Sequence, residues 1–219
     1  MTEQDPLKEL GHIRGLMDRS TRFLSLSGLS GVWAGVVALG GAFIAKSFID
    51  GFTHPSADPI TYGLIRGDQS YSVLLGILAV DAVSVLILAL LGAFWFTWRR
   101  ARRTGQTLWD LSARRLFWNL TVPLVAGGLF CLALLMYGLP GLALSATLVF
   151  YGLALINASK YTLDEIRWLG LSEAALGVVA AFWPTAGLLF WALGFGVLHI
   201  FYGGLMYLRY ERGQQVNEG

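Results

Sequence analysis

Three ionisable side chains stand inside long apolar stretches of this chain, where a charge is expensive. Asp81, Glu173 and His199 are each several residues away from the nearest other charged position. A charged group at the centre of a bilayer costs about 2.5–3.5 kcal/mol on insertion scales, so such groups usually face other helices or water. Histidine titrates near neutral pH, and carboxyl groups at this depth can hold a proton. The chemistry that these residue types offer is proton binding or proton transfer.

Glu173 and His199 are expected at overlapping depths if the stretches that carry them pack side by side. Glu173 follows Arg167 by six residues, and His199 precedes Arg209 by ten. At a rise of about 1.5 Å per residue, these offsets bring the two side chains within reach of each other. We predict a carboxylate–imidazole pair, with Asp81 higher in the same cavity. Asn119 is predicted to add a polar contact to this intramembrane site.

Structural roles compete with this interpretation at each position. The Asp81 carboxyl could be protonated or hydrogen-bonded and simply hold two helices together. His199 could be an interior imidazole whose hydrogen bonds are satisfied, with no function in proton transfer.

Other chemistry finds little support in the spacing of residues. One deep histidine and carboxylates at different depths do not make a zinc site, and a haem would need axial ligands at matched depth. No P-loop, GxSxG elbow or Ser-His-Asp arrangement is present. We therefore expect no catalytic residue, no metal and no cofactor, although an enzyme is not excluded. A lipid-modifying site would have to lie in the loop 46–70, whose candidates match no ligand motif: Asp50, His54, Asp58 and Asp68.

The composition indicates a membrane protein. Of the 219 residues, 55% are hydrophobic and only 14% are charged, whereas soluble domains average about a quarter charged. The net charge of +2 is too small to argue for a nucleic-acid partner. Cys131 is the only cysteine, so it cannot form an internal disulfide.

The elements that must position these side chains are apolar helices. We predict an all-α membrane protein with six transmembrane helices, over about 23–45, 71–97, 116–137, 141–158, 166–183 and 187–208. Residues 1–22 are predicted to form an amphipathic helix at the cytoplasmic interface, and residues 209–219 a cytoplasmic tail.

The basic residues predict the orientation of the chain. In the six-span scheme, fourteen of the sixteen lysines and arginines fall on one side, the exceptions being Lys46 and Arg66. Cytoplasmic connections collect basic residues, so both termini are predicted to be cytoplasmic. The cluster 99–103 is expected to contact anionic lipid, and the cytoplasmic face is the expected place for a protein partner.

The chain also resembles itself. Phe150-Tyr151-Gly152 and Phe201-Tyr202-Gly203 recur at matching places, each 34 to 35 residues after a basic residue, Arg115 or Arg167. This repeat suggests three antiparallel helical hairpins, against the alternative of chance similarity among apolar segments. Small residues predict close helix packing on three of the spans: Ser27, Gly31 and Gly35; Ala174, Gly177 and Ala181; Gly196 and Gly203. Thr162 and Glu165 have the spacing of a helix capping box.

Three segments resemble those of an uncharacterised family of small bacterial six-span integral membrane proteins. They are 22–30 (RFLSLSGLS), 160–171 (KYTLDEIRWLGL) and 190–203 (FWALGFGVLHIFYG). The resemblance implies a multi-pass location in the bacterial cytoplasmic membrane and assigns no activity to any residue.

Two functions fit these expectations. The first is a signalling or accessory protein that binds a ligand or a proton at a polar site inside the bundle. The alternative is a small proton-coupled transporter or channel that uses the same acids as a relay.

Overall fold

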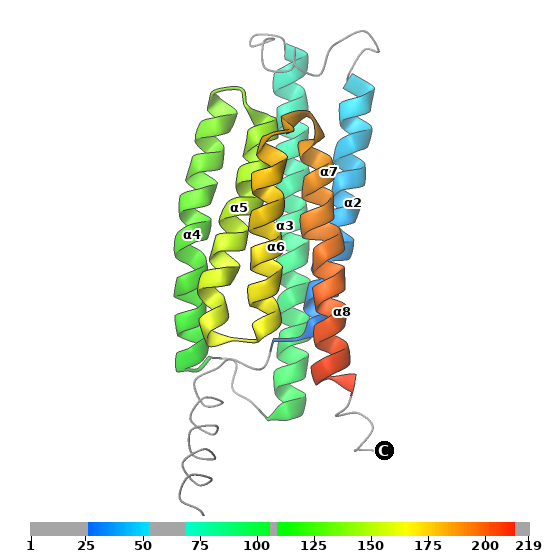
Figure 1. The fold of residues 1–219 in the computed structure, drawn as a ribbon. Helices are drawn as coiled ribbons and strands as arrows, with labels where there is room; N and C mark the ends of the chain where they lie inside the picture. The colour runs from blue at the N-terminus through cyan, green and yellow to red at the C-terminus, as the bar shows by residue number, and fades with distance from the viewer. Residues whose placement is uncertain (1–25, 53–68, 106–108, 213–219) are drawn as a thin grey trace, which may run out of the picture.

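The computed structural model describes residues 26–52, 69–105 and 109–212, and every regular element in these ranges is a helix (Figure 1). The helices are α2 (Gly28–Phe52), α3 (Gln69–Thr104), α4 (Leu111–Met136), α5 (Pro140–Ala158), α6 (Asp164–Ala181), α7 (Gly187–Trp191) and α8 (His199–Tyr210). A π-helical segment, Ala192–Leu198, joins α7 directly to α8 and is called the π segment below. The prediction of an all-α protein is confirmed for the described residues.

Five of the described helical stretches are long and apolar enough to cross a membrane. They correspond to α2, α3, α4, α5 with the following turn, and the continuous rod from Pro184 to Tyr210. The helix α6 is not among them, and its 18 residues include four charged ones: Asp164, Glu165, Arg167 and Glu173. The sequence and structure together therefore support a membrane protein.

The helix ends differ from the predicted spans by a few residues. The helix α2 begins at Gly28 and continues to Phe52, and α3 continues to Thr104, well past the predicted end at 97. Basic residues continue the helix here because arginine has good helix propensity and suits a helix C-terminus. The predicted interfacial helix 1–22, the loop residues 53–68 and the tail residues 213–219 lie outside the described residues.

The helices run alternately up and down and form two groups (Figure 1). In one group α5 packs between α4 and α6, and in the other α2 packs between α3 and α8. The two groups meet where α5 and α6 contact α7, the π segment and α8. The two arms of the third predicted hairpin contact each other, but α8 packs mainly against α2 and α6 mainly against α5.

Glycines allow α2 and α8 to approach backbone to backbone. A Cβ atom added at Gly203 would lie 2.6 Å from the Val32 nitrogen and 2.7 Å from the Gly28 oxygen. The helices α5 and α6 make a second close approach, since a Cβ at Gly152 would lie 2.6 Å from the Gly170 oxygen. Small residues drive helix association in lipid because they let backbones come close. The predicted packing role of Gly31, Gly35, Gly196 and Gly203 is thus confirmed as contact within the bundle.

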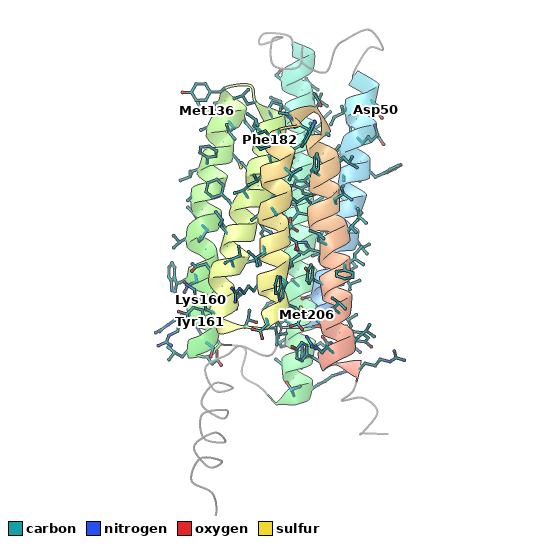
Figure 2. The ribbon with its side chains drawn as sticks, in the orientation of Figure 1. Asp50, Met136, Lys160, Tyr161, Phe182 and Met206 are labelled. Atoms are coloured by element: carbon teal, nitrogen blue, oxygen red, sulfur yellow. The ribbon has the colours of Figure 1, made fainter. Side chains whose placement is uncertain are left out.

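The two ends of the bundle differ in charge. Figure 2 shows Asp50, Met136 and Phe182 toward one end and Lys160, Tyr161 and Met206 toward the other. The second end, called the basic end below, also holds the arginines at the end of α3, the start of α4 and the end of α8. At the opposite end, Lys46 forms an exposed ion pair with Asp50 at 2.9 Å.

The start of α2 is held by groups from α3 and α8. The Glu211 carboxylate accepts hydrogen bonds from the Ser27 hydroxyl and the Gly28 backbone N–H, and it lies 3.4 Å from Arg100 Nη1. Arg100 also donates to the Leu26 carbonyl oxygen. A carboxylate at a helix N-terminus satisfies unpaired N–H groups and faces the positive end of the helix dipole. This cluster fixes the first turn of α2 to the last turn of α8.

We expect Glu211→Ala to lower the free energy of unfolding by about 1–3 kcal/mol, because it leaves the Gly28 N–H without its acceptor and removes the carboxylate that faces Arg100. Reversible unfolding in mixed micelles measures this. The exposed neighbour Arg212 is the matched control, and Arg212→Ala should change stability by less than about 0.5 kcal/mol. Equal effects of the two substitutions would contradict the assignment.

The start of α6 is tied to α8 through Glu165. Leu163 is the N-cap residue and makes no capping hydrogen bond with its side chain. The Glu165 carboxylate accepts hydrogen bonds from Arg209 and Tyr210 of α8. The capping box of Thr162 and Glu165 stays a prediction, and the contact with α8 is one that sequence spacing does not show.

Candidate functional site

Glu173 and His199 meet between α6 and α8, as the sequence predicts. His199 Nδ1 lies 3.2 Å from Glu173 Oε1. The Glu173 side chain is completely buried, and His199 is 5% exposed. Glu173 stands near the middle of α6, and His199 is the first residue of α8. The pair therefore joins the two groups of helices at mid-depth.

Tyr151 of α5 completes the cluster from the other side of the imidazole. Its hydroxyl lies 2.9 Å from His199 Nε2, and the two rings are 5.4 Å apart. A neutral imidazole accepts from this hydroxyl at Nε2, whereas an imidazolium donates to it. Phe195 of the π segment packs against both rings, tilted at 4.9 Å from Tyr151 and stacked at 5.8 Å from His199. Aromatic walls thus shield the imidazole.

The π segment shapes the space around the carboxyl. A Cβ atom at Gly194 would lie 2.5 Å from Glu173 Oε2 and 2.4 Å from Leu148 Cδ2. The Glu173 carboxyl therefore fills the place that a side chain at Gly194 would need. The Gly194 carbonyl oxygen lies 3.3 Å from His199 Nδ1 and accepts its hydrogen when that nitrogen carries one. Such π-helical turns inside α-helices are frequent at functional sites.

The Glu173 carboxyl lacks hydrogen-bond partners among the described residues. Within the described residues, neither of its oxygens has a hydrogen-bond partner, although His199 Nδ1 is close. An unsupported carboxylate in apolar surroundings is costly, and so is an isolated imidazolium. The pair avoids both costs when it holds one proton, either as acid and neutral imidazole or as carboxylate and imidazolium.

Three titratable groups meet here, Glu173, His199 and Tyr151, and the π segment adds none. Gaining or losing a proton changes the net charge of this buried site by one. Because Glu173 and His199 lie 3.2 Å apart, a proton bound by one side chain changes the charge that the other faces.

Asp81 is not brought to this pair. It lies on α3, which packs against α2, and its Oδ2 would be 3.5 Å from a Cβ atom at Gly41. Within the described residues it forms no ion pair with Glu173 or His199. A cavity shared by all three groups therefore stays a prediction.

Asn119 is also elsewhere, near the start of α4. Its side-chain amide donates to the Arg115 carbonyl oxygen at 2.8 Å, and its own carbonyl accepts from Asn157 of α5 at 3.0 Å. The Asn119 side chain therefore bonds within α4, and its backbone carbonyl links α4 to α5. The described residues also contain no group of three histidine, cysteine, aspartate or glutamate side chains that could hold a metal ion.

Sequence reasoning missed the parts of the site that come from neighbouring helices. Tyr151 was visible only as part of the Phe-Tyr-Gly repeat, with no indication that its hydroxyl faces His199. Gly194 had no signal, because its role depends on the π segment. Comparisons with protein families, curated proteins and solved structures found no match to this chain.

Proposed function

We propose that this chain is an integral membrane protein that binds a proton at the Glu173–His199 pair and acts as a signalling or accessory protein. The observation that carries the proposal is the fully buried Glu173 carboxyl, 3.2 Å from His199 and without a hydrogen-bond donor of its own among the described residues. Ionisable residues inside membrane helices are rare and commonly mark ion or proton sites. The pair lies at the joint between the two groups of helices, so its charge affects how they pack.

The packing favours a proton over a larger ligand at this site. The Glu173 carboxyl touches Gly194 where a methyl group would not fit, and Leu148 and Phe195 close the surroundings. A proton needs no volume, whereas any molecule with heavy atoms would have to push α6 and the π segment apart. We therefore narrow the proposed ligand of this site from a ligand or a proton to a proton alone.

The membrane arrangement that goes with this function has six spans and both termini in the cytoplasm. The basic end supports that orientation, because lysine and arginine collect on the cytoplasmic side. In this arrangement α6 is the fifth span, tolerated despite its charges because α5 and α8 cover Glu173 and Glu165. We place the protein in a bacterial cytoplasmic membrane, with anionic lipid and a protein partner at the basic end. The same proposal includes an origin of the bundle from three repeated helical hairpins.

Single substitutions at the pair should change stability with opposite pH dependence. In Glu173→Gln, acid protonates His199 and buries a positive charge without a counter-ion, so stability should fall toward acidic pH. In His199→Gln, alkali ionises Glu173 and buries a lone negative charge, so stability should fall toward alkaline pH. A wild-type pair that holds one proton matches the unfolded chain between the ordinary pKa values of glutamic acid and histidine, about 4.3 and 6.5, so its profile should be flat in that window.

Thermal unfolding in nanodiscs across the pH range measures these three profiles. Coincident profiles for the wild type and both variants would show that the pair does not exchange a proton. Asn119→Ala, which changes a polar residue away from the pair, is the control and should keep the wild-type profile.

A proton-coupled transporter or channel is the alternative, favoured by Asp81 as a second acid in an apolar helix. Transport predicts proton flux in reconstituted vesicles that Asp81→Asn abolishes. The signalling or accessory role predicts no flux and a co-purifying partner that is lost when residues 1–20 are removed.

A further inference from the structure

Two facing stripes of side chains lead from the basic end to the buried pair. On α6 the stripe has spacings of four, three and one residues, and on α8 it has spacings of three, four and four, so each lies along one face of its helix. The α6 stripe is Glu165, Leu169, Ser172 and Glu173, and the α8 stripe is His199, Tyr202, Met206 and Tyr210. In each stripe an apolar residue lies between polar residues. The three levels are called the outer polar step, the apolar step and the inner polar step below.

The outer polar step lies at the basic end. Glu165 Oε1 accepts from Arg209 at 2.8 Å and from the Tyr210 hydroxyl at 3.1 Å. The Glu165 side chain is 7% exposed, whereas that of Arg209 is 71% exposed. Arg209 covers Glu165 at this end of the contact between α6 and α8, which is called the seam below. Arg209 itself is exposed at the surface of the protein.

The inner polar step lies directly below the pair. The Ser172 and Tyr202 hydroxyls are 3.2 Å apart across the seam. Ser172 precedes Glu173 by one residue, and Tyr202 follows His199 by three. Both hydroxyls therefore lie on the basic-end side of the pair.

An apolar step separates the two polar steps. Leu169 and Met206 are buried there, at 5% and 3% exposure, in a cluster that Tyr202 and Tyr210 flank. Seven residues separate Glu165 from Ser172, which is about 10 Å along a helix and too far for direct proton transfer. Methionine is unbranched and flexible, so Met206 can move aside more easily than a branched side chain.

The opposite side of the pair is closed by tight apolar packing. Leu148 is fully buried, and a Cβ atom at Gly177 would lie 2.8 Å from its Cβ and 2.7 Å from the Val149 nitrogen. Beyond them the Trp191 and Phe195 rings stack at 4.9 Å. No hydroxyl pair comparable to Ser172 and Tyr202 joins α6 to α7 among the described residues.

We propose that protons reach the Glu173–His199 pair from the basic end, through the seam between α6 and α8, and that Leu169 and Met206 form the barrier that limits the rate. This inference rests on the proposed function. Water that passes Met206 finds hydrogen-bond partners in the Ser172 and Tyr202 hydroxyls, as an internal water requires. The Glu165 cluster and the Ser172 and Tyr202 hydroxyls then provide hydrogen-bonding groups on the two sides of one apolar barrier.

Hydrogen–deuterium exchange at the His199 ring tests the route. The probe is D2O added to nanodisc-embedded protein that is labelled with 15N-histidine and carries His12→Gln and His54→Gln, so that only His199 reports. Met206→Ser should accelerate exchange of the ring N–H about tenfold, because a small polar side chain admits water. Met206→Leu, which conserves volume, should leave the rate within about twofold of the wild type.

Leu148→Ser is the matched control on the opposite side of the pair. Faster exchange in Leu148→Ser than in Met206→Ser would overturn the proposal and place the entrance at the other end. Equal rates in all variants would overturn it too. Backbone amide exchange in α4 and α5 separates opening of the seam from general loosening, since general loosening would accelerate those amides as well.

Failure of the route and failure of the proposed function can be told apart. If Met206→Ser is fast but the pH profiles of Glu173→Gln and His199→Gln coincide, the seam admits water to a pair that has no proton-binding role. If those profiles diverge as expected but Met206→Ser exchanges at the wild-type rate, the pair binds a proton that arrives by another path.

Discussion

Replacing His199 with leucine should destabilise the folded protein by about 3–5 kcal/mol, the largest effect expected of any single substitution in the chain. The substitution removes the one group, among the residues that the structure describes, that pairs with the completely buried Glu173 carboxyl and can carry a compensating charge. It also leaves the Tyr151 hydroxyl without its partner. The loss should be larger at alkaline than at acidic pH, because acid supplies the proton that neutralises the stranded carboxyl.

A double-mutant cycle separates this pairing effect from simple loss of packing. Glu173→Met combined with His199→Leu should recover most of the stability, because two apolar side chains of similar size leave no buried charge. Reversible unfolding of the four proteins in mixed micelles gives the coupling free energy. If the two single losses merely add, the pair contributes packing alone, and the charge argument is wrong.

Replacing Gly203 with alanine should destabilise the protein by about 1–3 kcal/mol through overpacking. The added Cβ atom would lie 2.6 Å from the Val32 nitrogen and 2.7 Å from the Gly28 oxygen. Backbone atoms cannot turn away as a side chain can, so α2 and α8 must separate. Since α3 packs on α2, this one methyl group weakens the attachment of both helices to the rest of the bundle.

Gly204 provides the matched control for this prediction. It is the next residue of α8, and a Cβ atom there would meet nothing within 4 Å. Gly204→Ala should leave stability unchanged or raise it by up to about 1 kcal/mol, because alanine favours the helix. The same unfolding experiment measures both variants, and a loss in Gly204→Ala equal to that in Gly203→Ala would rule out backbone contact as the cause.

The sequence predicted well what depends on composition and on helix spacing. The apolar stretches predicted helices that the structure has, with ends displaced by a few residues at α2 and α3. The offsets of Glu173 from Arg167 and of His199 from Arg209 predicted overlapping depths, and the structure places the two side chains 3.2 Å apart. The glycines predicted close helix contacts because lipid offers no other strong driving force for association.

The sequence could not show which helices become neighbours. Asp81, like Glu173, is an acid deep inside a predicted span. However, α3 packs mainly on α2, whereas α6 packs mainly on α5. The π segment is invisible in the spacing of residues, although it brings Gly194 against Glu173 and Phe195 against His199. Glu165 illustrates the same limit, since the sequence does not show that its carboxylate accepts from Arg209 and Tyr210, which lie about 45 residues further along the chain.

The protonation state of His199 as pH is varied tests the central claim most directly. Solid-state 15N NMR of the nanodisc-embedded protein, with His199 as the only labelled histidine, distinguishes the imidazolium from the neutral ring. We predict that Glu173→Gln lowers the imidazolium fraction of His199 at acidic pH, because the counter-charge at 3.2 Å is gone. A His199 titration that is the same with and without the Glu173 carboxyl would contradict a coupled proton-binding pair.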